Sequence, residues 1–203
     1  MHTHSLAAYV ECIERNDWEG VADLMLDSAG KLKHAGANFL ICPDNTIHQA
    51  MNMVEPRSPL PWLNIADVVA DDAVERGYRH LGLLGTRWLV ESDVYPQKLA
   101  VHGIAWMRPN DEERREIDRI IMDELVYGVF RPESVTYLQL VIRRMKDEGC
   151  DAVVLGCTEI PLIISNQNSP LPVLDSTRLL AWAALKLAVA LDEPARAPRF
   201  QYP

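Results

Sequence analysis

The sequence predicts an α/β protein whose parallel strands are covered by helices on both faces. Amphipathic helical patterns alternate with short apolar runs along the chain, which is the element order of α/β folds. The apolar runs, such as residues 151–156 (DAVVLG), are hydrophobic throughout rather than at every second position. That pattern is typical of strands buried on both faces. With 203 residues the chain is long enough for a substantial core.

The helical segments begin and end at capping signals. Asn16 and Asp17 precede the second helix, in which apolar residues recur every three or four positions, and Gly36 ends it. Gly77 ends a later helix in the same way. Helices are predicted over residues 5–14, 18–35, 46–53, 66–76, 92–101, 110–126, 132–148 and 176–191.

The predicted strands are short apolar runs that end at proline, glycine or polar residues. Pro43 stops the first run, and Gly85 and Gly156 end two others. The last twelve residues contain three prolines and are expected to lie along the surface. Strands are predicted over residues 38–42, 63–65, 80–85, 104–107, 151–156 and 172–174.

Charge and cysteine content exclude several classes of protein. The 20 basic and 29 acidic residues give a net charge of −9 with no basic stripe, which argues against nucleic-acid binding. No apolar run reaches the roughly 18 residues of a membrane span, and the N-terminus does not resemble a signal peptide. Four cysteines without a CxxC motif predict a reduced, cytoplasmic protein. His2 and His4 are expected to lie in a frayed terminus, so we predict no metal site.

Two segments of the chain match without a gap. Residues 36–48 (GANFLICPDNTIH) align with residues 149–161 (GCDAVVLGCTEIP), so that Asp44 takes the position of Cys157. Both residues follow a strand at its carboxyl end, where open parallel sheets bind ligands. If the units face each other, the two side chains converge on one cleft. The same helix–glycine–strand order also occurs in α/β folds generally.

Residue chemistry marks Cys157 and Asp44 as candidate acid/base groups. Backbone N–H groups after the strand are placed to stabilise a Cys157 thiolate. The position of Cys157 is equally consistent with a small buried thiol that has no reactive role. Asp44 suits proton transfer if burial raises its pKa, and suits helix capping otherwise. Cys42 and Cys150 are expected to be core residues.

Neutral and charged groups near these two residues suit an amino-acid ligand. Asn45, Thr46 and Thr158 offer hydrogen bonds to a carboxylate or serve as caps. Glu159 is suited to orient an ammonium group or to cap a helix. The Arg131 guanidinium is able to clamp a second carboxylate, or else lies on the surface.

Four motifs carry a resemblance to a known family. PDNTIH, LGCTEIPLII, LLGTR and DELVYGVFRPES resemble motifs of the cofactor-independent aspartate/glutamate racemases, a family with related hydantoin racemases, maleate isomerases and arylmalonate decarboxylases. The resemblance covers about residues 17–190. It implies two pseudo-symmetric lobes, a homodimer, no cofactor or metal, and two cysteines that exchange the α-proton on opposite faces of the substrate.

The resemblance assigns roles residue by residue. Cys157 matches the second catalytic cysteine, while Asp44 stands where the family has its first. It also implies that Arg131 holds a distal carboxylate. The residues matched to substrate-binding positions are Asn45, Thr46 and Thr158 for the α-carboxylate, and Thr86 in a substrate loop.

The start of the chain departs from the family pattern. The usual N-terminal strand, glycine-rich loop, helix and second strand are absent, so we expect a shortened first lobe. That lobe is predicted to comprise residues 1–62 with part of 176–203, and the second lobe residues 63–175. Missing strands would leave an edge that another protomer covers.

The resemblance and the residues together predict a racemase of an acidic amino acid, aspartate or glutamate, with Asp44 and Cys157 as an unequal proton-carrying pair. A small amino acid or dicarboxylate is the expected partner, with neither nucleic acid nor membrane. Two alternatives remain open. One is a decarboxylase or cis-trans isomerase of the same superfamily that uses Cys157 alone, and the other is a binding relative without catalysis.

Overall fold

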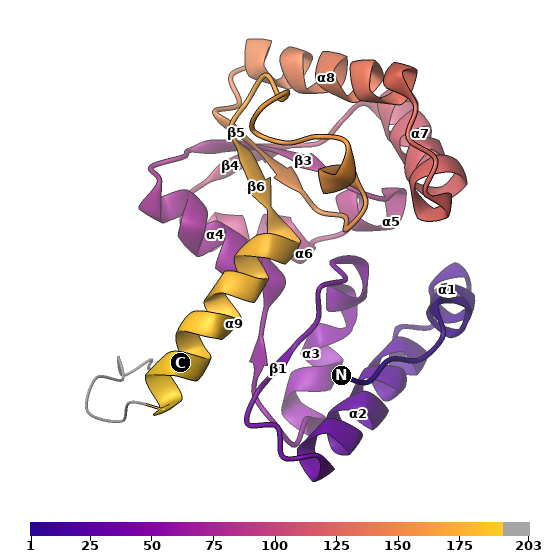
Figure 1. Cartoon of the computed structure of the whole chain (residues 1–203), viewed down its shortest axis with the longest axis vertical. Coiled ribbons are helices and arrows are strands. Elements are labelled where there is room, and N and C mark those ends of the chain that lie inside the picture. Colours follow the sequence, from indigo (N-terminus) through magenta and orange to yellow (C-terminus); the bar gives the residue numbers. More distant parts are fainter. Residues whose placement is uncertain (193–203) are drawn as a thin grey trace.

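The computed structural model describes residues 1–192 and contains two parallel sheets (Figure 1). The larger sheet has the strand order β4-β3-β5-β6, and the smaller pairs β1 with β2. Helices alternate with these strands along the chain, which confirms the predicted α/β class. The strands are β1 (Leu40–Ile41), β2 (Trp62–Leu63), β3 (His80–Leu84), β4 (Ala105–Met107), β5 (Ala152–Leu155) and β6 (Val173–Asp175).

Helices form where the capping signals predicted them. The Asp17 carboxylate accepts the Gly20 N–H at 2.8 Å, and Gly36 takes a left-handed φ of 88° beyond the helix end. The α-helices are α1 (Leu6–Glu14), α2 (Trp18–His34), α3 (Met51–Val54), α4 (Ile65–Glu75), α5 (Arg87–Val90), α6 (Val94–Val101), α7 (Asp111–Arg119), α8 (Pro132–Asp147) and α9 (Ser176–Asp192).

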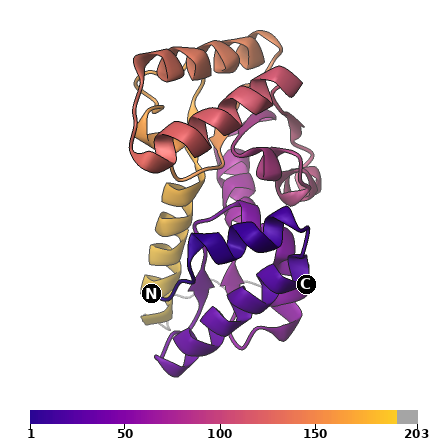
Figure 2. The same cartoon turned by 90° about the vertical axis from the view of Figure 1, so that its right-hand side faces the viewer.

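The larger sheet is the middle of three layers. Val153 and Leu155 of β5 pack in one core with α7 and α8, while Ala152 and Val154 pack in another with α4 and α6. All four residues of β5 are buried. Figure 2 shows α7 and α8 on the outer side of this sheet. The uniformly apolar strands therefore reflect burial on both faces.

The smaller sheet has a different environment. Helices α1 and α2 lie side by side (Figure 2), and α2 packs against α3 and the 3-10 helix η1 (Thr46–Ala50). Leu40 of β1 is buried, but Ile41 is 40% exposed. The prediction of a fully buried strand over residues 38–42 is thus wrong, because one face of this two-stranded sheet remains open. Helix α9 runs back from β6 to contact β2 and α4.

Two local segments differ from the predicted elements. Residues Arg87–Val90, which were expected in a loop, form α5, because the Thr86 hydroxyl accepts the Leu89 N–H at 3.3 Å as a helix cap. The expected helix over residues 110–126 changes after Arg119 into a π-helix, η3 (Ile120–Glu124), and a 3-10 turn, η4 (Leu125–Tyr127). The predicted surface tail lies outside the described residues from 193 onward. None of the described helices is long and apolar enough to cross a membrane.

Candidate active site

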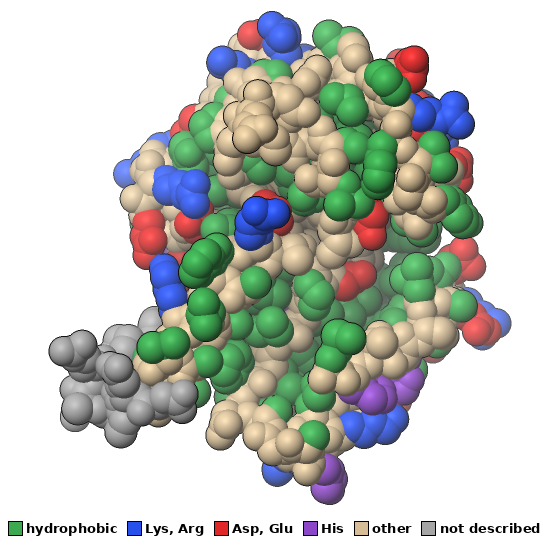
Figure 3. All heavy atoms as spheres, in the orientation of Figure 1, with side chains coloured by type: hydrophobic (Ala, Val, Ile, Leu, Met, Phe, Trp, Pro, Cys, Tyr) green, Lys and Arg blue, Asp and Glu red, His purple; other side chains and the backbone are tan. Residues whose placement is uncertain are grey.

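The two repeat units place Asp44 and Cys157 at equivalent positions. Gly36 after α2 and Gly149 after α8 both take positive φ values, 88° and 96°, and each leads into a strand. Asp44 then precedes η1, and Cys157 precedes the 3-10 helix η5 (Ile160–Leu162). In Figure 1 the loop after β1 reaches toward the larger sheet. Figure 3 shows acidic side chains in the recess between the part of the molecule around the larger sheet and the part around the smaller sheet.

Cys157 is a buried thiol with a carboxylate as its partner. Its residue is 8% exposed, and its Sγ donates a hydrogen bond to Glu159 Oε2 at 2.8 Å. Burial raises the pKa of the thiol, and the negative charge of Glu159 raises it further. The backbone N–H groups of Glu159 and Ile160 oppose this increase. Glu159 is thus placed to accept the proton that a reactive thiol has to lose.

Asp44 is accessible to water, yet its carboxyl lies among protein atoms that displace much of its solvation. This desolvation raises the pKa of Asp44, while hydrogen bonds from the Ile47 and Thr46 N–H groups oppose the change. The charge of Glu159 also raises the pKa of Asp44. The charge of Glu159 thus raises the pKa of both candidate acid/base groups, Asp44 and Cys157.

His48 fixes the loop that carries Asp44. Its Nε2 accepts the Ile65 N–H at 3.4 Å, so its Nδ1 carries the proton and donates to the Asp44 carbonyl oxygen at 2.7 Å. Burial lowers the pKa of His48 to about 4, so the ring is neutral near pH 7. Cys42 donates weakly to the same carbonyl, with Sγ 3.9 Å away, and burial raises the pKa of its thiol to about 12.

Asn45 is tied to the protein at both ends of its amide. The Tyr95 hydroxyl donates to Asn45 Oδ1 at 2.6 Å, and Asn45 Nδ2 donates to Ser176 Oγ at 3.0 Å. Ser176 in turn donates to the Leu155 carbonyl oxygen at 2.8 Å. This buried chain of hydrogen bonds joins η1 to α6, α9 and the end of β5. The second N–H of the Asn45 amide takes no part in this chain of hydrogen bonds.

Thr46 and Thr86 lie together at the site. Their hydroxyl oxygens are 3.2 Å apart, although they come from strand ends in different sheets. Glycine permits a separate close approach between the ends of β3 and β5. A Cβ on Gly85 would lie 3.1 Å from the Gly156 carbonyl oxygen, and a Cβ on Gly156 would lie 3.0 Å from the Leu84 carbonyl oxygen.

The remaining predicted binding residues differ in their placement. Thr158 is exposed beside Cys157. Arg131 points elsewhere, and its partner among the described residues is Glu124. Its Nε lies 3.7 Å from Glu124 Oε1, and its side chain is 61% exposed. Glu124 is itself buried and accepts hydrogen bonds from Arg119 and Ser134.

The sequence did not predict three residues that hydrogen-bond to Asp44 or Asn45. His48 belongs to the PDNTIH motif, and its distance of four residues from Asp44 is the signal that could have revealed it. Ser176 at the start of α9 was visible only as a helix-start residue. Tyr95 carries no sequence signal for its role. A cavity of about 400 Å³ opens beside His48 and Lys98, and none of the predicted site residues lines it.

Comparison with known proteins identifies the family. A family model described as Asp/Glu/Hydantoin racemase matches residues 1–184. A crystal structure of a candidate Asp/Glu racemase from Yersinia pestis is 35% identical, with a TM-score of 0.81 over 88% of this chain and 78% of that one. An aspartate racemase homologue from Pyrococcus horikoshii is 32% identical, with a TM-score of 0.77 over 86% and 76%.

A more distant relative is the broad specificity amino-acid racemase RacX of Bacillus subtilis, which is 20% identical over 86% of this chain and 75% of its own. The family match over most of the chain agrees with the paired strand-end units seen in the structure. The chain belongs to the aspartate, glutamate and hydantoin racemase family.

Proposed function

We propose that the protein racemises an acidic amino acid, aspartate or glutamate, by moving the α-proton between Cys157 and Asp44. The observation that carries the proposal is the 2.8 Å contact between the Cys157 thiol and the Glu159 carboxylate, with Asp44 within the field of the same carboxylate. The family membership and the aspartate racemase homologue among the structural neighbours support this reaction class.

The proton transfers follow from the electrostatics of the site. Cys157 passes its proton to Glu159, and the thiolate then removes the α-proton from one face of the substrate. Asp44, whose raised pKa favours the protonated form, delivers a proton to the opposite face. In the reverse direction Asp44 is the base and the Cys157 thiol is the acid. Exchange with water after product release restores the starting protonation.

Substrate binding is assigned to the polar groups at the strand ends. The hydroxyls of Thr46, Thr86 and Thr158 and the remaining Asn45 N–H would hold the α-carboxylate. Carboxyl oxygens of Asp44 and Glu159 would accept hydrogen bonds from the substrate's ammonium group. Arg131 would bind the distal carboxylate, which requires its exposed guanidinium to turn away from Glu124. Comparable turnover of alanine or asparagine would contradict this role for Arg131.

The proposal is tested by α-proton exchange in heavy water. L- and D-aspartate and L- and D-glutamate are incubated separately with the full chain, and the α-proton signal is followed by NMR beside chiral chromatography. We expect exchange with inversion, reduced by about 100-fold or more in Cys157→Ala and in Asp44→Asn. Cys42→Ala is the matched control, because that thiol is close to Asp44 but has a pKa of about 12.

The variants separate the alternatives. Exchange without inversion that survives Asp44→Asn would identify a one-base enzyme that uses Cys157 alone, and malonate-type acids would be tested next. Ligand binding without any exchange would identify a binding protein. Absence of both with all four amino acids would refute the acidic amino-acid proposal.

We propose further that the protein is a cytoplasmic homodimer. Within the described residues β1 pairs only with β2, so the other edge of β1 is unpaired. Ile41 of this strand is also exposed, on the open face of the small sheet. Unpaired strand edges favour association with another chain. All four cysteines, which lie in the described part, are free thiols, as expected in a reducing compartment. Light scattering after gel filtration measures the mass, and a monomer at micromolar concentration would contradict the dimer.

A further inference from the structure

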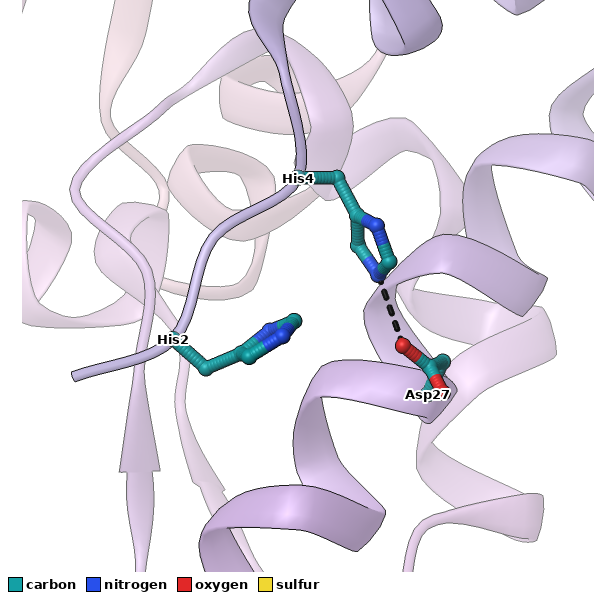
Figure 4. A group of neighbouring side chains, drawn as sticks. All are labelled: His2, His4 and Asp27. Atoms are coloured by element: carbon teal, nitrogen blue, oxygen red, sulfur yellow. Dashed lines mark ion pairs between the residues drawn. The ribbon is translucent and has the colours of Figure 1, made fainter.

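A second cluster of metal-binding side chains lies away from the candidate active site. His2, His4 and Asp27 each offer one ligand atom, and these three atoms lie within 4.8 Å of one another (Figure 4). The histidines come from the segment before α1, and Asp27 comes from α2. His2 Nδ1 lies 2.9 Å from Ser28 Oγ, and His4 Nε2 lies 2.8 Å from Asp27 Oδ2. Thus the structure places the N-terminal segment against α2, in contrast to the frayed terminus that the sequence predicted.

We propose that His2, His4 and Asp27 bind a divalent transition metal ion, with Zn²⁺ as the best match. Two imidazoles and one carboxylate form a ligand set that zinc prefers, and water completes a tetrahedral site. The burial of His4 Nε2 also supports the proposal. This atom is enclosed by the protein and faces Asp27 Oδ2 at 2.8 Å, so the imidazole and the carboxylate already turn toward the same point.

The charges around the cluster are compatible with a cation. Lys31, one turn along α2, is at present the positive partner of the Asp27 carboxylate. Lys31 Nζ lies 2.5 Å from Asp27 Oδ2 and is the group that the ion has to displace. Its side chain is 52% exposed, so it is free to turn into water. The metal would then replace the lysine as the positive partner of Asp27.

The position of the cluster gives the bound ion a structural role. It would fasten the N-terminal segment to α2 and so fix the start of α1. Ser28 is shared by His2 and by Tyr9 of α1, whose side chain packs in the core beneath the site. None of the residues proposed to transfer protons belongs to the cluster, so the inference stands independently of the proposed reaction.

Zinc binding to the full chain tests the proposal. The protein carries no N-terminal tag, is stripped with EDTA, and is titrated calorimetrically with zinc chloride near pH 7.5. We expect one bound ion per chain. His2→Gln, His4→Gln and Asp27→Asn should each weaken binding by about tenfold or more. His34→Gln is the matched control, because His34 is also on α2 but lies outside the cluster, and it should bind zinc as the wild type does.

Thermal unfolding supplies a second readout that does not depend on activity. Zinc at about 100 times Kd should raise the Tm of the wild type by about 5–10 °C, and EDTA should reverse the increase. The three ligand variants should match the wild-type Tm in EDTA and show no zinc response. Absence of stoichiometric binding, binding that survives Asp27→Asn, or an equal loss in His34→Gln would overturn the proposal.

Discussion

Replacing Asn45 by alanine should destabilise the protein as well as weaken ligand binding. The Asn45 amide joins Tyr95 to Ser176 in the interior, where these three residues are 3%, 2% and 0% exposed. Alanine removes the acceptor of the Tyr95 hydroxyl and one donor to Ser176 Oγ. The Tyr95 hydroxyl then remains buried without its acceptor, and Ser176 keeps only its bond to the Leu155 carbonyl oxygen.

The size of the effect follows from these two losses. A buried donor without an acceptor costs about 1–3 kcal/mol, and an ordinary lost hydrogen bond costs about 0.5–1.5 kcal/mol. Asn45→Ala should therefore lower the free energy of unfolding by about 2–4 kcal/mol. For a chain of this size that corresponds to a fall in Tm of roughly 5–12 °C.

Urea and thermal unfolding of four variants check the prediction. Tyr95→Phe removes one hydrogen bond and should cost about 0.5–1.5 kcal/mol. The double variant should cost less than the sum, because it no longer leaves an orphaned hydroxyl at position 95. Asn52→Ala, at an exposed position on α3, is the control and should change stability by no more than about 0.5 kcal/mol. Wild-type stability in Asn45→Ala, or strict additivity with Tyr95→Phe, would refute the assignment.

Three further predictions address the site and the strand ends. Glu159→Gln should lower the pKa of Cys157 and speed its alkylation by iodoacetamide at a given pH, measured by mass spectrometry of the Cys157 peptide; an unchanged rate would contradict the charge effect. The hydrogen bond from Ser134 contributes most to lowering the pKa of Glu124. The Glu124 carboxylate therefore stabilises the fold above its unfolded pKa of about 4.3, and this stabilisation is lost as the pH falls through the lower pKa of the folded state. Glu124→Gln should weaken the acid dependence of urea unfolding, and an unchanged pH slope would exclude this contribution. Gly156→Ala should destabilise the protein by about 1–3 kcal/mol, because the new Cβ would lie 2.5 Å from Leu89 Cδ2 and 3.0 Å from the Leu84 carbonyl oxygen. Gly30→Ala should stabilise the protein by about 0.5–1 kcal/mol, because its Cβ meets open space within α2. Similar unfolding curves for the two variants would contradict the packing argument.

The sequence alone determined the α/β class and the two strand-end units. Helix limits followed from local signals such as Asp17 and Gly36, whose effects act within one turn of backbone. The alignment of Asp44 with Cys157 also rests on local order, since a glycine, a strand and a polar turn follow each other in both units. Such patterns depend on hydrogen bonds between residues close in the chain, and those are readable before folding is considered.

Only the tertiary structure decided which distant groups meet. Asn45 and Ser176 are 131 residues apart in the chain, yet their side chains bond in the interior. In the same way Arg131 lies beside Glu124, and the terminal histidines lie against Asp27. Contacts of this kind depend on how whole helices and sheets pack, which no periodicity of single residues encodes. Local sequence therefore places the candidate acid/base residues at strand ends, whereas packing decides their partners, their desolvation and their pKa values.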